Sequence, residues 1–437
     1  MMTTRKVRIV CVSDTHNQTP KLPAGDVLIH AGDLTNQGSA AELKRTVEWL
    51  EKSDFQAKIV VAGNLPGTYL SNVRMFTADV HCDCSRVTCA NQLDMDAGNH
   101  DTTLDPPFFH SHANKWKWPG PQDPEACRRL LLSSPSVTYL QHEAATIYLP
   151  RTRTCLRVFG SPYSPGRRGW AFQYWGEGEA EEIWGTGEMD GVDVMVTHSP
   201  AYGCLDGTEE GSAGCGALKE RLASVRPAMH VCGHIHGGRG VERVRWRGEE
   251  GEMDVEVTGA ENADAESDLS RLVESVEHWT DPGAGNKKIS LVDATRKAGR
   301  GIEYMHAGGV PRHVVPDKFR GLFGESDEAQ PGAPEPHPMS SLEDGALLSS
   351  SEAGVATWRR KAGGAIECRT RSDVGRSKVD GPAPESTGVE RRETLMINAA
   401  FLSPRVVGKA STFNKPIVVD VELPVWEFAS KAALEAQ

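Results

Sequence analysis

The turn at residues 98–101 places three side chains of different chemistry beside one another. It is Gly98-Asn99-His100-Asp101, which offers an amide oxygen, an imidazole and a carboxylate. On its own it could be an ordinary turn, because Gly and Asn often supply the backbone conformations that turns require. Four other places in the chain carry Asp or His in a similar loop, and their spacing makes this turn informative.

A short apolar run precedes each of these four places, and each run has the length of a β-strand. The runs and the side chains that follow them are 7–12 with Asp14 and His16, 27–30 with Asp33, 194–197 with His198, and 229–232 with His234 and His236. Ligands of open α/β sheets bind beyond the carboxyl ends of the strands. We therefore expect these side chains to meet along one rim of a sheet.

The candidate ligands offer oxygen and nitrogen atoms and no thiolate. They are Asp14, His16, Asp33, Asn99, His198, His234 and His236. These seven groups exceed the four ligands of a tetrahedral zinc ion, so two ions of the Mn, Fe or Zn kind, bridged by one carboxylate, fit better. Such a pair clamps the attacking and leaving oxygens of a phosphoryl centre and ionises its water to hydroxide near neutral pH.

Each motif also has a purely structural interpretation when it is taken alone. Asp14 could cap a turn, Asp33 could belong to a Gly-Asp turn, and His234 and His236 could alternate across an edge strand. Five motifs in order, each at the end of a predicted strand, favour a metal site over that interpretation.

The first part of the chain predicts a parallel βαβ unit. Residues 6–12 and 58–62 are rich in β-branched residues and predict buried strands. Between them, residues 39–52 predict a helix that Ser39 can cap. Because such units place ligands at the carboxyl ends of their strands, the first motifs fall at the expected edge.

Later elements are less regular. The runs 137–140, 146–149 and 156–159 predict a second, more antiparallel sheet, and residues 217–225 predict a helix. Further strands are expected at 192–197, 241–246, 254–257, 393–399 and 416–421. We expect a loop at 106–121, and flexible segments at 260–290 and 324–390, where Gly, Pro, Ser and charged residues dominate.

The predicted organisation has three parts. Residues 5–320 form a catalytic domain, residues 324–390 form a flexible tract, and strands within residues 391–425 return to the domain. The catalytic domain contains an apparent insertion, because the three residue types of Ala62-Gly63-Asn64 recur at Ala97-Gly98-Asn99. Only the second copy is followed by the His and Asp that complete the turn.

The 35 residues of this insertion, 65–99, are polar and without a strand or helix pattern. We hypothesise that they are a retained intron, translated with the gene. A genuine loop insertion is the alternative, although structureless loops of this length are uncommon in compact domains. The insertion leaves open whether Asn64 or Asn99 is the amide ligand, and we favour Asn99 because it adjoins His100.

The composition of the chain excludes some classes of protein. The chain has 437 residues, 38% of them hydrophobic, and a net charge of −12. The acidic balance argues against general binding of nucleic acids or of an anionic membrane. The ten cysteines lack a framework spacing, and no secretory signal or membrane-spanning stretch is visible, so we expect a reduced, cytoplasmic protein.

Three further clusters have two interpretations each. The cysteines and histidine of residues 81–89 could bind zinc, but they lack a CxxC pair and we favour ordinary side chains. For the His-x-His pair at 110–112 we favour surface histidines over ligands. The aromatic residues of 161–175 could wall a substrate pocket or form a packed loop, and the sequence does not favour either.

The order of the motifs resembles that of the calcineurin-like metallophosphoesterase superfamily. The motifs are D-x-H at 14–16, GD at 32–33, GNHD at 98–101, His198 and GHxH at 233–236. The resemblance extends from the first strand to Gly238. The segments at 30–35, 160–163, 170–172, 233–237 and 414–418 look like the metallophosphoesterase-domain-containing subgroup, whose members resemble low-activity phosphodiesterases.

The resemblance implies an α/β fold, a four-layer αββα sandwich of two mixed sheets with helices outside. It assigns Asp14, His16 and His236 to one metal ion, Asn99, His198 and His234 to the other, and Asp33 to both. His100 would protonate the leaving oxygen, and Asp101 would orient His100 through a hydrogen bond. His30 is expected to support the ligands or to pack.

The implied function is hydrolysis of a phosphate ester, a diester rather than a monoester, by a metal-bridging hydroxide that attacks phosphorus in line. The substrate would be a small phosphate ester, with nucleotides among the candidates. One alternative is a phosphomonoesterase or protein phosphatase. The other is a catalytically silent protein that binds a nucleotide or a partner, because an insertion beside Asn99 and His100 could misplace them.

Overall fold

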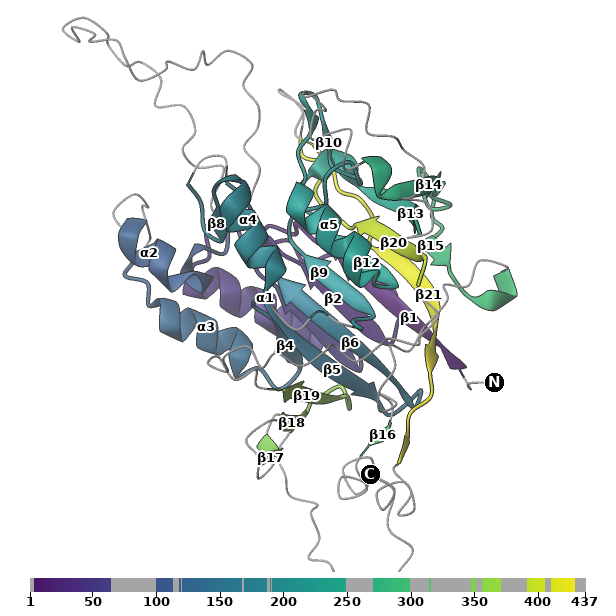
Figure 1. Ribbon diagram of the computed structural model, residues 1–437. Coiled ribbons are helices and arrows are strands. Elements are labelled where there is room, and N and C mark those ends of the chain that lie inside the picture. The colour runs from purple at the N-terminus through teal and green to yellow at the C-terminus, as the bar shows by residue number, and fades with distance from the viewer. Residues whose placement is uncertain are drawn as a thin grey trace, which may run out of the picture.

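The computed structural model consists of two β-sheets packed face to face with helices on their outer faces (Figure 1). The described residues are 4–63, 100–112, 118, 120–166, 169–186, 189, 191–248, 270–298, 314–315, 347–350, 356–370, 391–404 and 410–428. The expected strand at 254–257, the cysteines of residues 81–89 and the apparent insertion lie outside the described residues.

The first sheet, within the described residues, has the strand order β15-β21-β1-β2-β3-β4. The bounds are Ser290–Asp293 (β15), Ile417–Pro424 (β21), Thr4–Val12 (β1), Val27–Ala31 (β2), Ala57–Val61 (β3) and Val137–Tyr139 (β4). Strands β1 to β4 run parallel, whereas β21 is antiparallel to β1. Every residue of β2 and β3 is buried, as expected for parallel strands covered on both faces.

The second sheet has the strand order β14-β13-β20-β12-β9-β6-β5-β19-β18-β17 in the described part of the chain. The bounds are Val273–His278 (β14), Gly240–Trp246 (β13), Glu393–Asn398 (β20), Met229–Cys232 (β12), Val194–Thr197 (β9), Thr154–Ser161 (β6), Glu143–Leu149 (β5), Ile366–Thr370 (β19), Ala356–Arg360 (β18) and Leu347–Ser350 (β17). Its central strands β6, β9, β12 and β20 are parallel, and the remaining pairs are antiparallel.

Three hydrophobic clusters define four layers. Apolar residues from both sheets, including Ile29 and Val196, form the cluster between the sheets. Helices α1 (Ala40–Lys52) and α3 (Pro124–Leu132) cover the outer face of the first sheet. Helices α4 (Gly176–Gly185) and α5 (Gly216–Val225) cover the outer face of the second (Figure 1). The predicted four-layer αββα architecture is confirmed.

Helix α1 begins where the sequence predicts. The Ser39 side chain accepts a hydrogen bond from the Glu42 backbone, and the Glu42 side chain accepts one from the Ser39 backbone. This reciprocal capping box satisfies donors that the first helical turn cannot pair. The buried face of α1 comprises Leu43, Thr46, Val47 and Leu50.

The remaining elements are short. They are η1 (Thr102–Leu104), α2 (Pro106–His112), β7 (Ser164–Pro165), β8 (Gln173–Tyr174), β10 (Gly207–Thr208), β11 (Gly211–Ser212), η3 (His236–Gly238), η5 (Arg296–Ala298), β16 (Val314–Val315) and β22 (Glu427–Phe428). Across the described residues, no helix is both long enough and apolar enough to span a membrane.

Two expectations about the middle of the chain are wrong. Residues 137–140 were assigned to the second sheet, but β4 pairs in parallel with β3 at the edge of the first. The crossover through α3 explains this, because a helix between two strands favours a parallel pair in one sheet. Residues 106–121 were expected to form a loop, but α2 occupies 106–112, with its two prolines in the first turn where missing N–H groups are tolerated.

The expected flexible segments also contain strands. Within 260–290, β14 pairs with β13. Within 324–390, β17, β18 and β19 extend the second sheet beyond β5. Polar composition predicted flexibility here because these strands lie at or near a sheet edge, where polar side chains are compatible with pairing.

Candidate metal centre

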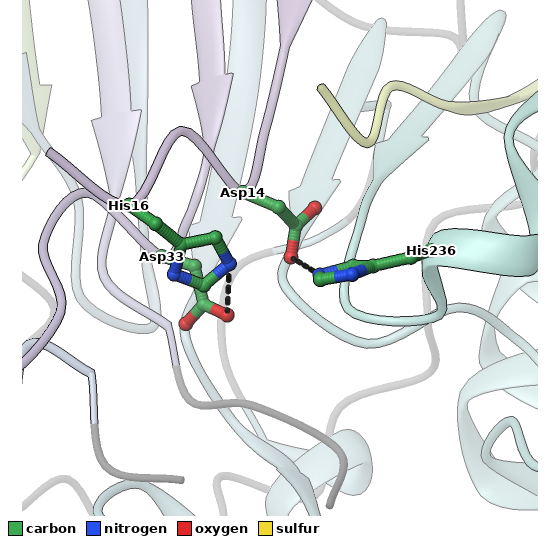
Figure 2. Close-up of side chains that lie close together, drawn as sticks. All are labelled: Asp14, His16, Asp33 and His236. Carbon is green, nitrogen blue, oxygen red and sulfur yellow. Dashed lines mark ion pairs between the residues drawn. The ribbon is translucent and has the colours of Figure 1, made fainter. Parts of the chain in front are cut away.

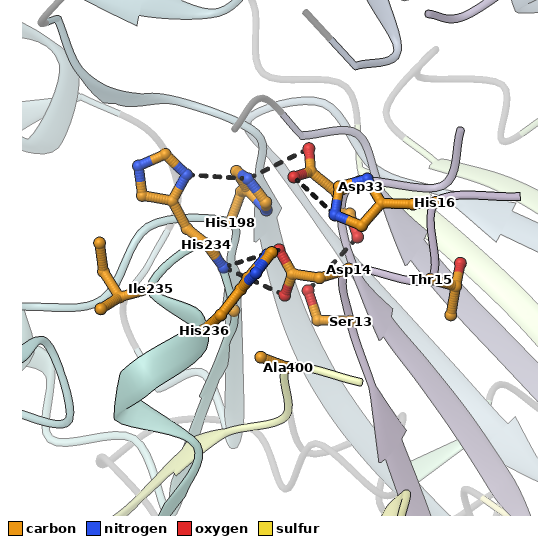
Figure 3. Close-up of polar contacts among 12 residues, drawn as sticks. Ser13, Asp14, Thr15, His16, Asp33, His198, His234, Ile235, His236 and Ala400 are labelled. Atoms are coloured by element: carbon orange, nitrogen blue, oxygen red, sulfur yellow. Dashed lines mark hydrogen bonds and ion pairs between the residues drawn. The ribbon is translucent and has the colours of Figure 1, made fainter. Parts of the chain in front are cut away.

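The predicted ligands follow strands whose carboxyl ends meet at one rim of the two sheets. Asp14 and His16 follow β1, and Asp33 follows β2 in the first sheet. His198 follows β9, and His234 and His236 follow β12 in the second sheet. The site therefore spans both sheets, and each sheet supplies ligands on short, tightly held loops (Figure 3).

Four of these side chains point toward one another (Figure 2). Asp14, His16, Asp33 and His236 each offer one ligand atom, and these atoms all lie within 4.8 Å of one another. Nε2 of His236 lies 3.4 Å from Oδ1 of Asp14, and Nε2 of His16 lies 3.7 Å from Oδ2 of Asp33. Two carboxylates and two imidazoles at this spacing suit a divalent ion of the Mn, Fe or Zn kind.

Asp33 also faces a second group of ligands. Its Oδ1 lies 3.3 Å from Nε2 of His198, and that nitrogen lies 3.1 Å from Nδ1 of His234 (Figure 3). Nδ1 of His198 donates to the carbonyl oxygen of Ala31 at 2.9 Å, which fixes the ring so that Nε2 faces the site. One carboxylate thus lies between two sets of ligands.

Backbone conformation at the site is unusual. Four of the predicted ligands have positive φ, namely Asp14 (54°), His16 (45°), Asp33 (53°) and His234 (67°). Non-glycine residues in this left-handed region cost about 1–3 kcal/mol each and persist where the surroundings determine them. The Asp14 and His16 backbone N–H groups donate to the carbonyls of Gly32 and Asp33, which stabilises the two loops against each other.

Two glycines allow these loops to approach closely. Gly32 has φ of +99°, and a Cβ there would collide with the His198 ring. A Cβ on Gly233 would collide with the Ser13 and Asp14 side chains. The glycines that precede the Asp33 and His234 motifs are therefore required by close packing of the ligand loops.

Several ligand atoms lack hydrogen-bond partners among the described residues. Both ring nitrogens of His16, both carboxylate oxygens of Asp33 and Nε2 of His236 are buried and without such a partner. Leaving buried polar atoms unpaired costs free energy, so such a group usually indicates an ion or ligand that satisfies them. The donor set, O and N without sulfur, fits divalent metal ions.

The pKa values of the two carboxylates in the cluster are shifted in opposite directions. Burial and the neighbouring Asp14 carboxylate raise the pKa of Asp33 well above its usual value. Burial alone would raise the pKa of Asp14 too, but the contact with His236 lowers it below its usual value. Two adjacent buried carboxylates cannot both ionise without a compensating charge, and a cation supplies that charge.

His100 lies beside this cluster but lacks its expected partner. Its ring lies edge-on to the His16 ring, with centroids 4.2 Å apart. Burial lowers the pKa of His100 to about 4. The expected hydrogen bond from His100 to Asp101 is not made, because the Asp101 carboxylate accepts from other donors.

Asp101 instead joins the ligand loops. Its carboxylate accepts hydrogen bonds from the backbone N–H groups of Leu34, Thr35 and Gly63 at 3.0, 3.0 and 3.1 Å, and from the Thr35 hydroxyl at 2.7 Å. Burial raises the pKa of Asp101 to about 7, although these hydrogen bonds oppose the shift. Asp101 therefore orients the loop that carries Asp33 rather than the His100 ring.

The chain leaves the site at Gly63 and re-enters it at His100. The Gly63 N–H contacts Asp101, so both sides of the apparent insertion lie at the rim. Asn64 and Asn99, the two candidate amide ligands, are outside the described residues.

Other predicted residues lie away from the cluster or pack in the interior. His30 bonds through Nε2 to the Thr15 hydroxyl at 2.9 Å and packs against Trp49, so its contacts fit both expected roles, support of the ligand loop and packing. His110 is exposed on α2, and His112 stacks on Phe108. The aromatic side chains of Trp170, Phe172 and Tyr174 are buried, as in a packed loop, whereas Trp175 is 51% exposed, so both interpretations stay open.

Two further residues, neither of them predicted as a site residue, contact the site loops. Thr35 binds Asp101, and Asn398, the last residue of β20, contacts the loop that carries His234 and His236. Asn398 ends a strand as the ligands do, which was the available signal. Thr35 ends the segment 30–35 that resembles the subgroup, and that resemblance was the available signal.

The fold and these side chains define the class of the protein: an α/β protein with a candidate metal site of Asp and His side chains beyond the strand ends of a two-sheet sandwich. The sequence model of the family described as calcineurin-like phosphoesterase matches residues 7–238, more than half of the chain. The chain belongs to this family, which depends on a dinuclear metal centre.

Curated relatives match a similar share of the chain. The Emericella nidulans protein named "Probable rhamnogalacturonate lyase C" is 36% identical over 242 residues, 55% of this chain and 18% of that protein. Metallophosphoesterase domain-containing protein 1 of Homo sapiens and of Mus musculus is 34% identical over 239 residues, 54% of this chain and 62% of those proteins. The chain thus covers less than two thirds of the length of each of these three relatives.

Proposed function

We propose that this protein is a metal-dependent phosphoric ester hydrolase that acts on small phosphodiesters, with nucleotides among the candidate substrates. The observation that carries the proposal is the position of Asp33. Its two oxygens lie 3.7 Å from Nε2 of His16 and 3.3 Å from Nε2 of His198, so one carboxylate joins two ligand sets. Two-ion phosphoryl-transfer sites have this arrangement.

The ligands divide between two positions on either side of Asp33. Asp14, His16 and His236 would hold one ion, and His198 and His234 would hold the other together with an asparagine amide, Asn99 or Asn64. The buried, unpartnered atoms of His16, Asp33 and His236 support this assignment. Mn, Fe and Zn all suit such an oxygen and nitrogen set, so the donor atoms alone do not select among these metals.

When bound, the two ions supply Lewis-acid polarisation of the phosphoryl oxygens and activate water as a nucleophile. The chain supplies position and proton control. His100 lies against His16, one of the predicted ligands, which supports a role for its N–H as the donor to the oxygen that leaves. Because burial lowers the pKa of His100 to about 4, the ring is neutral at neutral pH and acts as a hydrogen-bond donor.

The test compares hydrolysis of bis-p-nitrophenyl phosphate with that of p-nitrophenyl phosphate, with Mn²⁺ and with a chelator. We expect Mn²⁺-dependent turnover, faster on the diester. His100→Ala should lower kcat by about 100-fold, the range of general acid–base catalysis, whereas His110→Ala, at an exposed histidine of α2, should not. Equal loss in both variants, or turnover that persists in the chelator, would contradict the proposal.

The apparent insertion needs a separate comparison. Removing residues 65–99 joins Asn64 to His100, and the contact of Gly63 with Asp101 supports such a direct connection. If only the shortened chain turns over, Asn64 is the amide ligand and the segment is foreign to the site. If only the full chain turns over, Asn99 is the ligand. Reads of the mature transcript across the segment decide whether it is intron sequence.

The location of the insertion also favours one rival proposal. Because residues 64–99 separate Gly63 from His100 at the rim, a displaced amide ligand would leave a protein that binds metal and a phosphate compound without turnover. Metal binding without hydrolysis in both chain lengths would support this silent protein. Faster turnover of the monoester would instead support a phosphomonoesterase or protein phosphatase.

A further inference from the structure

The last residue of β20 lies beneath the loop that carries two predicted ligands. Strand β20 lies between β12 and β13, where Asn398 pairs with Cys232 on one side and Gly240 on the other. The 233–239 loop, which contains His234 and His236, leads from β12 to β13 and therefore passes over the end of β20. Asn398 is fully buried at that crossing.

The Asn398 amide nitrogen faces three backbone carbonyl oxygens. It lies 2.9 Å from Ile235 O, 3.1 Å from Leu205 O and 3.4 Å from Gly233 O. The amide oxygen accepts a hydrogen bond from the Ala400 N–H at 3.1 Å. This pattern fixes the orientation of the amide, because the flipped form would place its oxygen against three acceptors.

These contacts connect the two histidine loops of the second sheet. Ile235 and Gly233 belong to the 233–239 loop, and Leu205 belongs to the segment that follows His198. The two loops also touch directly, since a Cβ on Gly238 would collide with the Leu205 carbonyl oxygen. One side chain from a strand outside the 7–238 family match thus holds both loops at a fixed separation.

A buried asparagine at the end of this strand lowers the stability of the fold unless its amide is hydrogen-bonded. The preceding residues of β20, Leu395, Met396 and Ile397, are buried and apolar. Asparagine is disfavoured in strands, and burying an amide costs free energy unless its hydrogen-bonding groups are paired. At Asn398 they are paired almost entirely with carbonyls of the ligand loops.

We propose that Asn398 is a positioning residue for the metal centre. By holding the carbonyls on both sides of His234, it positions the imidazole of His236 against Asp14 and the imidazole of His234 against His198. Its own amide is engaged by backbone, so it acts through the loops and does not bind metal. The proposal rests on the proposed function, since it concerns the same metal site.

The test uses the full chain with Asn398→Asp, which keeps the shape but replaces the donor with an acceptor that repels the three carbonyls. Asn398→Ser keeps a single donor on a shorter side chain, and it is the second test variant if Asn398→Asp does not fold. Thr394→Val is the matched control, because Thr394 is buried in the same strand and loses hydrogen bonds to Pro227 and Trp246 at the opposite end.

Two quantities are measured: the Kd for Mn²⁺ by calorimetry, and amide exchange of residues 233–238 in the metal-free chain. We expect Asn398→Asp to raise the Kd about 10- to 100-fold, the usual effect of residues that orient metal ligands, and to speed exchange of the loop. For Asn398→Ser, we expect a Kd and an exchange rate between those of the unmodified chain and those of Asn398→Asp. Thr394→Val should lower the melting temperature and leave both quantities unchanged.

The proposal is overturned if Asn398→Asp and Asn398→Ser leave the exchange of 233–238 unchanged, or if Thr394→Val weakens Mn²⁺ binding as much as they do. Failure of the proposed function has a different signature, in which the unmodified chain binds no Mn²⁺ and hydrolyses neither ester. The exchange measurement then still decides whether Asn398 fixes the loop.

Discussion

Asp33 combines a buried carboxylate with a left-handed backbone conformation, and both are unfavourable unless a cation is bound. Asp33 is fully buried, its oxygens have no hydrogen-bond partner among the described residues, and its φ is 53°. The adjacent Asp14 carboxylate adds repulsion. The contacts of Asp33 with His16 and His198 support the proposed role of Asp33 as a metal ligand, in which a bound cation would offset these costs.

Asp33→Asn should therefore remove the stabilisation that metal provides. At an Mn²⁺ concentration about 100 times its Kd, we expect the unmodified chain to gain about 2.7 kcal/mol, seen as a higher melting temperature than in a chelator. The variant should show no such rise, because an amide does not supply the bridging charge. Asp26→Asn, which changes a carboxylate that binds Arg8 and Gln56 away from the site, should keep the rise. An equal rise in Asp33→Asn would refute the assignment.

A second residue-scale prediction concerns His230, which lies in β12 and donates through Nε2 to the Thr197 hydroxyl at 2.7 Å. Burial lowers the pKa of His230 to about 3. The unfolded chain therefore binds a proton below about pH 6.5 that the folded chain excludes, and stability falls as the pH drops.

His230→Gln keeps the donor and removes the titration. Between about pH 6 and pH 4, we expect the free energy of unfolding to fall with decreasing pH in both proteins. The slope of the variant should be smaller than that of the unmodified chain, and the difference should be about 1.4 kcal/mol per pH unit. Urea denaturation across this range measures the slopes. Parallel slopes for the two proteins would show that His230 does not contribute to acid sensitivity.

At the scale of elements, one hairpin of the second sheet is attached to the first sheet by a buried ion pair. Strands β18 and β19 lie within the tract expected to be flexible. Lys361, between them, forms a buried ion pair with Glu367 at 3.0 Å and donates to the Val137 carbonyl of β4 at 2.8 Å. The hairpin of the second sheet is thereby attached to the edge strand of the first.

Removing one partner of this pair should be costly. Lys361→Met leaves the Glu367 carboxylate buried with fewer compensating charges, and we expect the free energy of unfolding to fall by about 3 kcal/mol. The double variant Lys361→Met with Glu367→Leu should recover most of the loss, because it removes both buried charges. Urea denaturation measures both. A loss below about 1 kcal/mol in the single variant would show that the ion pair does not hold the hairpin.

At the scale of the whole molecule, the last described strands complete both sheets. Strand β21 lies between β15 and β1, and β20 lies between β12 and β13. Their side chains belong to the core between the sheets, for example Ile417, Val419 and Ile397. The 7–238 match therefore covers the ligands but not all of the strands that support them.

A chain that ends at residue 390 should not fold cooperatively. It lacks β20 and β21, so β1, β12 and β13 each lose a paired neighbour and the central core is exposed. We expect loss of the sigmoidal thermal transition followed by circular dichroism, whereas removing residues 429–437 should preserve it. A cooperative transition in the chain that ends at 390 would show that these strands are accessory.

The sequence by itself predicted the candidate ligands and the strands that carry them. Apolar runs of strand length followed by Asp or His are local patterns, and local patterns survive in the fold because side-chain alternation and turn chemistry act over a few residues. Asp14, His16, Asp33, His198, His234 and His236 were found in this way, and the structure places them together.

The tertiary structure decided the relations between distant segments. Which sheet receives β4, how the 347–370 strands extend the second sheet, and where the Asp101 carboxylate points all depend on pairings across tens or hundreds of residues. No local pattern encodes such pairings, because they are fixed by the packing of the whole core. Asn398 is the clearest case: its contacts with Gly233 and Ile235 join residues more than 160 positions apart.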